Sequence, residues 1–384
     1  MLKKQLPLLM TPGPTQVREN VRLACSAEMT NPDLDPDFFD FYKDTCDRLS
    51  RFLHTQNQVL ILSGEGMLGL DGVCVSLAEP GDRVLIIENG IFGEGFVDLV
   101  NLYGAEPVFF HGARDREIDA AALAAFLEND SDFKFATIVH CDTPSGVLND
   151  LKALCPLLKS YGILTVVDAV SSMVGEDIFV DDWTVDICIG ASQKGFSAPP
   201  GLTFLSVSPD AWSAMEKRKT PIASFYGNLL IWKNYYADFW FPYSPPSNSI
   251  YAISVALSNV EAEPGIVKRH ADLAQATRVA AQKAGLSLHL KSGYCNTVTA
   301  INAPAGIDGD ELVQQILDDD NILIGGCFGY LKGKVFRIGH MGENAKAENV
   351  AKALAAVQKA LKKNGVELKT DLEASFWEEY EKLK

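Results

Sequence analysis

The chain has 384 residues, of which 47% are hydrophobic and 22% are charged, and its net charge is -16. This length favours a large domain with a smaller one, and the negative charge argues against a nucleic-acid-binding surface, which needs clustered lysine and arginine. No apolar run approaches the ~18 residues of a membrane span, and Pro7, Pro12 and Pro14 interrupt the short apolar start. Neither a membrane protein nor a signal peptide is therefore expected.

Eight cysteines are scattered from Cys25 to Cys327 without a CxxC pair. This spacing predicts neither a metal site nor a disulfide framework. A reducing cytoplasm is the expected compartment.

Short β-rich runs alternate with helix-like segments between residues 58 and 206. The expected strands cover 59–62, 84–88, 106–110, 135–140, 163–168, 185–190 and 202–206, and most are continuously apolar, as in strands buried on both faces. The amphipathic segments between them include 94–103, 119–127 and 150–160. This alternation predicts an α/β domain with a mostly parallel sheet, in which ligands bind beyond the carboxyl ends of the strands.

The proline-bearing stretch 241–251 interrupts this pattern, and a long helical segment is predicted at about 252–284. The remainder predicts a small α+β domain with strands at 294–301, 321–326 and 334–339 and helices at 311–317 and 347–363. The charged tail 366–384 has Phe376, Trp377 and Tyr380 at helical spacing, which suits a last helix. We divide the chain into an N-terminal arm (1–20), a large domain (21–265) and a small C-terminal domain (266–384).

Two polar residues follow or end buried strands. Lys194 lies in IGASQKGFSAPPG (189–201), directly after a strand, where an amine can form a Schiff base with an aldehyde cofactor if its pKa is lowered. The alternative is a solvated lysine. Asp168 ends the strand in VVDAVSSM (166–173), and a buried carboxylate there needs a cation such as a protonated pyridine nitrogen. The alternative for Asp168 is a helix cap.

Three more segments suit ligand binding. The glycine turn in LSGEGMLGLDG (62–72) precedes a helix, whose first N–H groups can hold a phosphate, although Glu65 would repel it unless it faces away or binds something else. Phe92 follows a strand and can stack on a ring or lie in the core. Arg337 lies in an apolar strand, where a carboxylate ligand or a structural salt bridge would satisfy it.

The order of these segments resembles that of the class V aminotransferases of pyridoxal-phosphate fold type I. The alanine–glyoxylate and serine–pyruvate aminotransferase group is the most similar. The resemblance runs from TPGPT (11–15) to about residue 363 and includes HCDTPSGVLND (140–150). It implies a homodimer that uses pyridoxal 5′-phosphate to move an amino group from alanine, serine or glycine to glyoxylate or pyruvate.

The resemblance also implies roles in the chemistry. Lys194 carries the cofactor and moves the proton between the substrate α-carbon and the cofactor's C4′ carbon. Asp168 pairs with the pyridine nitrogen, Phe92 stacks on the ring, and Ser145 lies near the phenolic side.

For the phosphate, the resemblance implies backbone N–H groups of Gly66 and Met67 and the side chain of Gln193. Ser244 is placed where it reaches the phosphate of the neighbouring subunit's cofactor. These four residues form the predicted phosphate site.

For the substrate, the resemblance implies that Arg337 binds the α-carboxylate and that Gly13 lines the pocket. Arg337 alone among the arginines has a suitable strand context, so dicarboxylic substrates are not expected. Glu65 falls where several relatives have Ser or Thr, and the loop 325–334 is about one residue longer than in the human-type enzymes. Both departures concern the substrate pocket.

Three alternatives stay open. A cysteine desulfurase or another lyase of the superfamily would use a loop cysteine, and Cys327 lies ten residues before Arg337, but its neighbours do not form a desulfurase-like motif. A non-catalytic member would have lost Lys194, Asp168 or Arg337. An aminophosphonate transaminase is not distinguished.

Overall fold

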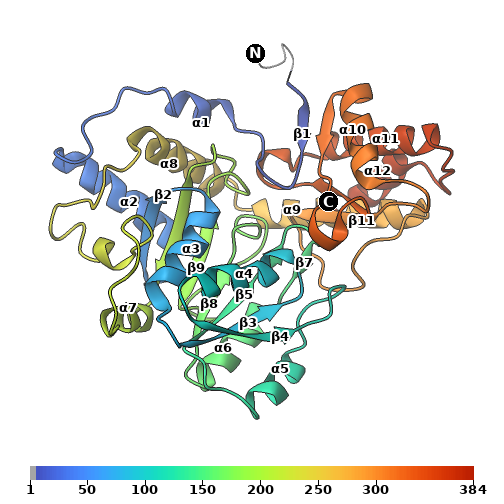
Figure 1. Cartoon of the computed structure of the whole chain (residues 1–384). Helices are drawn as coiled ribbons and strands as arrows, with labels where there is room; N and C mark the ends of the chain where they lie inside the picture. The colour runs from blue at the N-terminus through green and yellow to red at the C-terminus, as the bar shows by residue number, and fades with distance from the viewer. Residues whose placement is uncertain (1–5) are drawn as a thin grey trace.

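The computed structural model describes residues 6–384, and its centre is a seven-stranded sheet with strand order β2-β10-β9-β8-β5-β3-β4 (Figure 1). The strands are Gln58–Ser63 (β2), Arg83–Glu88 (β3), Glu106–His111 (β4), Phe135–Val139 (β5), Leu164–Asp168 (β8), Ile187–Ala191 (β9) and Leu202–Val207 (β10). β10 is antiparallel to both neighbours, and the other pairs are parallel. The predicted strands and the mostly parallel sheet are confirmed.

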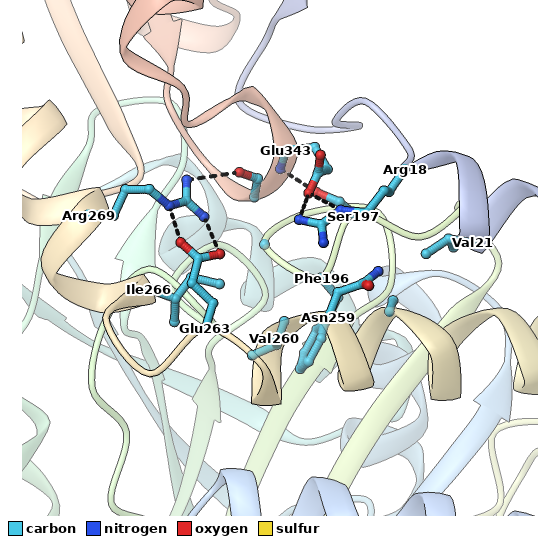
Figure 2. A pocket seen from close by; sticks show the side chains of 13 residues that line it. Arg18, Val21, Phe196, Ser197, Asn259, Val260, Glu263, Ile266, Arg269 and Glu343 are labelled. Carbon is cyan, nitrogen blue, oxygen red and sulfur yellow. Dashed lines mark hydrogen bonds and ion pairs between the residues drawn. The ribbon is translucent and has the colours of Figure 1, made fainter.

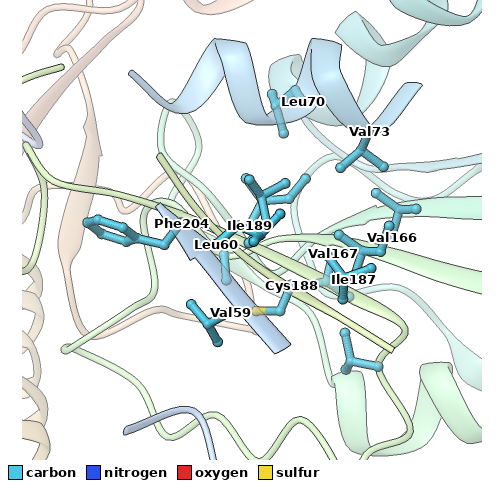
Figure 3. Close-up of a cluster of buried hydrophobic side chains, with 14 of the residues drawn as sticks. Val59, Leu60, Leu70, Val73, Val166, Val167, Ile187, Cys188, Ile189 and Phe204 are labelled. Atoms are coloured by element: carbon cyan, nitrogen blue, oxygen red, sulfur yellow. The ribbon is translucent and has the colours of Figure 1, made fainter. Parts of the chain in front are cut away.

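Continuous burial explains why the central strands of the sheet are mostly apolar, whereas the edge strand β4 is only partly buried. Every residue of β5, β9 and β10 is buried. Figure 3 shows Leu70 and Val73 of helix α3 (Gly66–Leu77) near side chains of β8 and β9 in this core. A Cβ at Gly69 would lie 2.4 Å from Thr203 Oγ1, so this glycine lets α3 approach the sheet closely.

Helices connect the strands of the sheet and flank it. They are Glu19–Ala24 (α1), Pro36–Phe52 (α2), Ile91–Leu102 (α4), Ala120–Leu127 (α5), Leu151–Ser160 (α6), Pro209–Glu216 (α7) and Ser247–Glu261 (α8). Asp35, Asp119, Asp150 and Ser208 cap four of them, each accepting a backbone N–H of the first turn. α4, α5 and α6 confirm the amphipathic segments predicted there.

A second cluster of buried side chains belongs to the C-terminal part, which lies in the upper right of Figure 1. Its helices are Ile266–Lys283 (α9), Gly309–Asp320 (α10), Ala347–Lys363 (α11) and Leu372–Leu383 (α12), and Val298–Asn302 (β11) pairs with Val335–Gly339 (β13). From the N-terminal arm, Leu8–Met10 (β1) pairs in parallel with Ile322–Ile324 (β12), a contact that the sequence did not predict. The two clusters support the proposed domain division, which stays a prediction.

One predicted element is wrong in extent. The single helix expected at 252–284 is two helices, α8 and α9, because the sequence between them contains Pro264 and Gly265. Proline has no N–H for the helix and glycine is a weak helix former, so the chain turns there. The strand expected from residue 294 begins at Val298.

The tail forms helix α12, which packs on α9 and α11 with Phe376 fully buried. Among residues 6–384, no helix combines the length and the apolar character needed to span a bilayer.

Candidate active site

A pocket opens where the carboxyl ends of β8 and β9 meet the start of α3. Asp168 is the last residue of β8, Lys194 follows β9, and Phe92 lies in the first turn of α4 after β3. The lining residues are Glu65, Gly66, Met67, Leu70, Phe92, Cys141, Thr143, Asp168, Val170, Ser171, Gln193 and Lys194. Six of the ten site residues expected from the sequence therefore share one pocket.

The amine of Lys194 is prepared for attack on a carbonyl. Its Nζ donates a hydrogen bond of 2.7 Å to Thr143 Oγ1. Desolvation lowers the pKa of Lys194 to about 8, and attraction to Asp168 opposes this shift only in part. A larger fraction of the amine is therefore neutral near pH 7 than for a solvated lysine.

The N-terminal segment TPGPT holds the loop that carries Lys194. Gly13 has a φ of 86°, and a Cβ on it would lie 2.7 Å from Lys194 Cδ, so only glycine fits against the lysine side chain. Thr15 Oγ1 lies 2.9 Å from both Lys194 O and Ser197 Oγ. These contacts orient the lysine from a segment almost 180 residues away, since Thr15 and Lys194 are 179 positions apart.

Asp168 is a buried carboxylate whose charge is only partly satisfied. Its Oδ1 accepts a hydrogen bond of 2.9 Å from the Val170 N–H, in a turn and not at a helix start, so the helix-cap alternative is wrong. Burial raises the pKa of Asp168 to about 6, while Lys194 lowers it and Glu65 raises it further. A cationic ring nitrogen would stabilise the carboxylate, so Asp168 suits a pyridinium partner.

Glu65 occupies the predicted phosphate site. It is the N-cap of α3, and its Oε1 accepts the Met67 N–H at 3.1 Å. Its Oε2 accepts a hydrogen bond of 3.0 Å from Gln193 Nε2. Glu65 thus engages two of the groups expected to hold a phosphate, Met67 and Gln193.

Arg337 binds backbone carbonyls. Its Nε donates to Gly326 O at 2.8 Å and its Nη1 to Thr143 O at 3.0 Å, and its Nη2 also donates to Gly326 O. No carboxylate within residues 6–384 forms an ion pair with it, so the salt-bridge alternative is wrong. Three of the five guanidinium N–H groups are engaged, which leaves two for a ligand.

Thr143 links the two cations of the site, and sequence reasoning missed it. Its hydroxyl accepts from Lys194 Nζ, and its carbonyl accepts from Arg337 Nη1. The amine and the guanidinium therefore lie on either side of one residue. The signal was present in the quoted segment HCDTPSGVLND, but only the fold shows which of its side chains reaches Lys194.

Ser145 is not part of the pocket lining. It lies between Cys141–Asp142 (β6) and Val147–Leu148 (β7), and its Oγ donates 2.7 Å to Asp142 Oδ2. Asp142, also missed from the sequence, accepts the Phe92 N–H at 2.9 Å through its other oxygen. Asp142 therefore positions Phe92.

Ser244 is exposed and does not line the pocket; its hydroxyl donates to Asp33. Within one chain it therefore has no contact with the site. Its predicted reach to a neighbouring subunit stays a prediction.

Cys327 does not suit a nucleophile. Its side chain is buried, and its Sγ lies 3.6 Å from Pro144 O. Burial raises the pKa of the thiol, so the reactive thiolate is disfavoured.

A second cavity lies behind the loop that follows Lys194, and its walls include Phe196 and Ser197 (Figure 2). Its charged residues form two ion pairs, Arg18–Glu343 and Arg269–Glu263 (Figure 2). Because these pairs neutralise their own charges, the cavity offers little to an ionic substrate. The pocket at Lys194 is the stronger candidate.

Known proteins resemble this chain over nearly its whole length. The family described as aminotransferase class-V matches residues 11–224. An uncharacterized aminotransferase of Methanocaldococcus jannaschii is 36% identical over 367 residues, covering 94% of both chains. A pyridoxamine–pyruvate transaminase of Mesorhizobium japonicum is 31% identical over 341 residues, covering 88% of this chain and 87% of its own. The structure of a ureidoglycine–glyoxylate aminotransferase from Bacillus subtilis has a TM-score of 0.94 at 27% identity and covers 99% of both chains.

Proposed function

This chain belongs to the class-V aminotransferase family, and on that premise we propose that it transfers an amino group from a small amino acid to glyoxylate or pyruvate. Relatives support the acceptor, because their names include ureidoglycine–glyoxylate and pyridoxamine–pyruvate transamination. The amino-group donors that these names contain, ureidoglycine and pyridoxamine, differ from each other. The choice of alanine, serine or glycine as donor therefore depends on this chain's own pocket.

The observation that carries the proposal is the pairing of Lys194 with Asp168 in one pocket. A pyridoxal ring, when bound there, supplies an electron sink for the substrate's α-carbon. The Lys194 amine would hold the ring's aldehyde carbon and then move a proton between the α-carbon and C4′. Asp168 would hold the ring nitrogen in its protonated form, and Phe92 would lie against the ring.

Pyridoxal 5′-phosphate, the cofactor predicted from the sequence, fits this pocket in part. Lys194, Asp168 and Phe92 suit its aldehyde and ring. Its phosphate does not fit as the residues lie, because Glu65 engages Met67 and Gln193. The proposed roles of Lys194, Asp168 and Phe92 depend on the ring and not on the phosphate.

Arg337 is the proposed group for the substrate carboxylate. It is buried beside Thr143, and two of its N–H groups have no partner among residues 6–384. Arg337 lies just outside the pocket lining and donates to the carbonyl of Thr143, which belongs to that lining. Within the lining itself, Lys194 is the one basic residue among the described residues, so a second carboxylate on the substrate would find no further cation there. This supports small monocarboxylic donors.

A panel of amino acids with glyoxylate, pyruvate and 2-oxoglutarate as acceptors tests the proposal. We expect kcat/KM for alanine or serine with glyoxylate or pyruvate to exceed that for aspartate or glutamate. A higher kcat/KM for a dicarboxylic donor would contradict the specificity. Failure to transfer nitrogen from any donor would contradict the function itself.

We also propose a homodimer in a reducing, cytoplasmic compartment. Phe225, Tyr226, Phe239 and Trp240 are each more than half exposed, with exposed fractions of 60%, 53%, 54% and 52%. Such aromatic exposure is typical of a surface covered by a partner. The compartment is supported by the eight cysteines, all of which are free in the structure.

A further inference from the structure

We infer that Glu65 excludes a phosphate from the pocket at Lys194, so that the pocket binds unphosphorylated pyridoxal in preference to pyridoxal 5′-phosphate. The inference rests on the proposed function, because it concerns the same pocket and the same covalent bond to Lys194. It deepens that function by specifying which form of the ring the chain recognises.

The chain supplies its own anion at the start of α3, the carboxylate of Glu65. The N-terminal end of a helix attracts negative charge, and its free N–H groups bind anions. Here the carboxylate of Glu65 accepts the Met67 N–H at 3.1 Å and Gln193 Nε2 at 3.0 Å. These donors cannot bind a phosphate in the same way while Glu65 holds them.

The charge of the pocket also disfavours a phosphate. Its ionisable lining residues are the acids Glu65 and Asp168, the thiol Cys141 and the amine Lys194. A phosphate monoester carries about −1.5 to −2 charges near neutral pH. Since Lys194 is the one basic residue in this lining and is committed to the aldehyde, a phosphate beside Glu65 would face a like charge without a compensating cation.

One buried acceptor in the pocket lining, Gln193 Oε1, lacks a donor among the described residues. The Ser171 hydroxyl, which is also unpartnered there, can donate or accept and so does not distinguish the two forms of the ring. An ionised phosphate offers acceptors only, whereas the hydroxymethyl group of pyridoxal offers an O–H donor. Glu65 and Gln193 Oε1 therefore suit the hydroxyl and not the phosphate.

Glu65 is partly exposed, so one competing arrangement has to be tested. In that arrangement its side chain turns into solvent and leaves the Met67 N–H and Gln193 to a phosphate. The two arrangements predict opposite orders of affinity for the two forms of the ring.

The experiment uses the full-length protein, freed of bound aldehyde with hydroxylamine and desalted. Pyridoxal and pyridoxal 5′-phosphate are titrated separately, and the visible absorbance band of the bond to Lys194 gives each Kd. Glu65→Gln removes the charge while keeping the shape of the side chain. Asp119→Asn is the matched control, because Asp119 is also an acidic N-cap, at the start of α5 and outside the pocket lining.

For the unaltered protein we expect pyridoxal to bind at least about tenfold more tightly than pyridoxal 5′-phosphate. In Glu65→Gln this preference should fall by at least about tenfold, mainly through tighter binding of the phosphorylated form. Asp119→Asn should leave both Kd values unchanged.

Equal or tighter binding of pyridoxal 5′-phosphate by the unaltered protein would overturn the inference. So would a preference for pyridoxal that is the same in Glu65→Gln. Either result would leave the proposed function intact, since Lys194 would still bind the ring. If neither aldehyde produced the absorbance band, the proposed function would be overturned, and the inference with it.

Discussion

Lys194 and Asp168 show opposite pKa shifts that have one cause. Burial disfavours the charged form of any group, so it lowers the pKa of Lys194 to about 8 and raises that of Asp168 to about 6. Each residue partly offsets the shift of the other by attraction. A pyridinium nitrogen beside Asp168 would add the cation that this acid lacks. The pKa shifts of Lys194 and Asp168 are therefore consistent with the proposed chemistry.

Replacement of Lys194 with alanine should remove the covalent bond to the ring. We expect no Schiff-base absorbance band and no transamination, because no other amine lines the pocket among the described residues. Borohydride reduction of the unaltered protein, followed by peptide mapping, should place the adduct on Lys194. An adduct on a different lysine would contradict the assignment.

Asp168→Asn should lower kcat by several orders of magnitude with little change in folding. A neutral amide cannot stabilise a protonated ring nitrogen, so the electron sink is lost. Steady-state kinetics and circular dichroism measure the two effects. A kcat within about tenfold of the unaltered value, or about 1.4 kcal/mol, would show that Asp168 has another role.

The rate of bond formation with pyridoxal should rise with pH and level off above about pH 8. Only the neutral amine attacks the aldehyde, and the pKa of Lys194 is lowered to about 8. Stopped-flow absorbance from about pH 6 to about pH 10 gives the midpoint. Asp168→Asn should move the midpoint down, because the attraction that raises the lysine pKa is gone; a midpoint near the ordinary lysine value would contradict the burial argument.

At the scale of elements, the terminal segments hold the C-terminal part together. β1 pairs with β12, and α12 packs against the helices α9 and α11 with Phe376 in the buried cluster. Met10 and Phe376 are both fully buried in the same cluster. β1 and α12 are therefore structural parts of one core.

Phe376→Ala should destabilise the protein by about 3–5 kcal/mol, because it removes a buried aromatic side chain and leaves a cavity. Thermal unfolding should show a lower Tm for this variant. Glu381→Ala, an exposed position of the same helix, is the control and should leave Tm nearly unchanged. Equal stability of the two variants would show that α12 is not anchored through Phe376.

At the scale of the whole molecule, the proposed dimer would cover the exposed aromatic residues of 225–240. Light scattering should give twice the chain mass of 41.8 kDa. Trp240→Glu, which puts a charge on this surface, should shift the protein toward monomers and lower its activity. An active monomer of the unaltered protein would contradict the proposal.

Local patterns were sufficient to predict the sheet and the main groups of the pocket. Apolar runs revealed the strands, and Lys194 and Asp168 stood out because each is polar at the end of such a run. The break between α8 and α9 was also visible in Pro264 and Gly265, although the helix prediction passed over it. These features depend on residues close together in the chain, so the sequence by itself determined them.

The contacts of individual side chains depended on the tertiary structure. Glu65 meets Gln193 across 128 positions, and Lys194 meets Thr143 across 51. Leu8 pairs with Ile322 only because the fold brings the arm to β12. Sequence spacing carries no information on which rotamer a side chain adopts or which distant segment packs beside it, because packing of the whole chain decides both. The glutamate in the predicted phosphate site is visible in the sequence, but its occupation of the phosphate donors is a property of the fold.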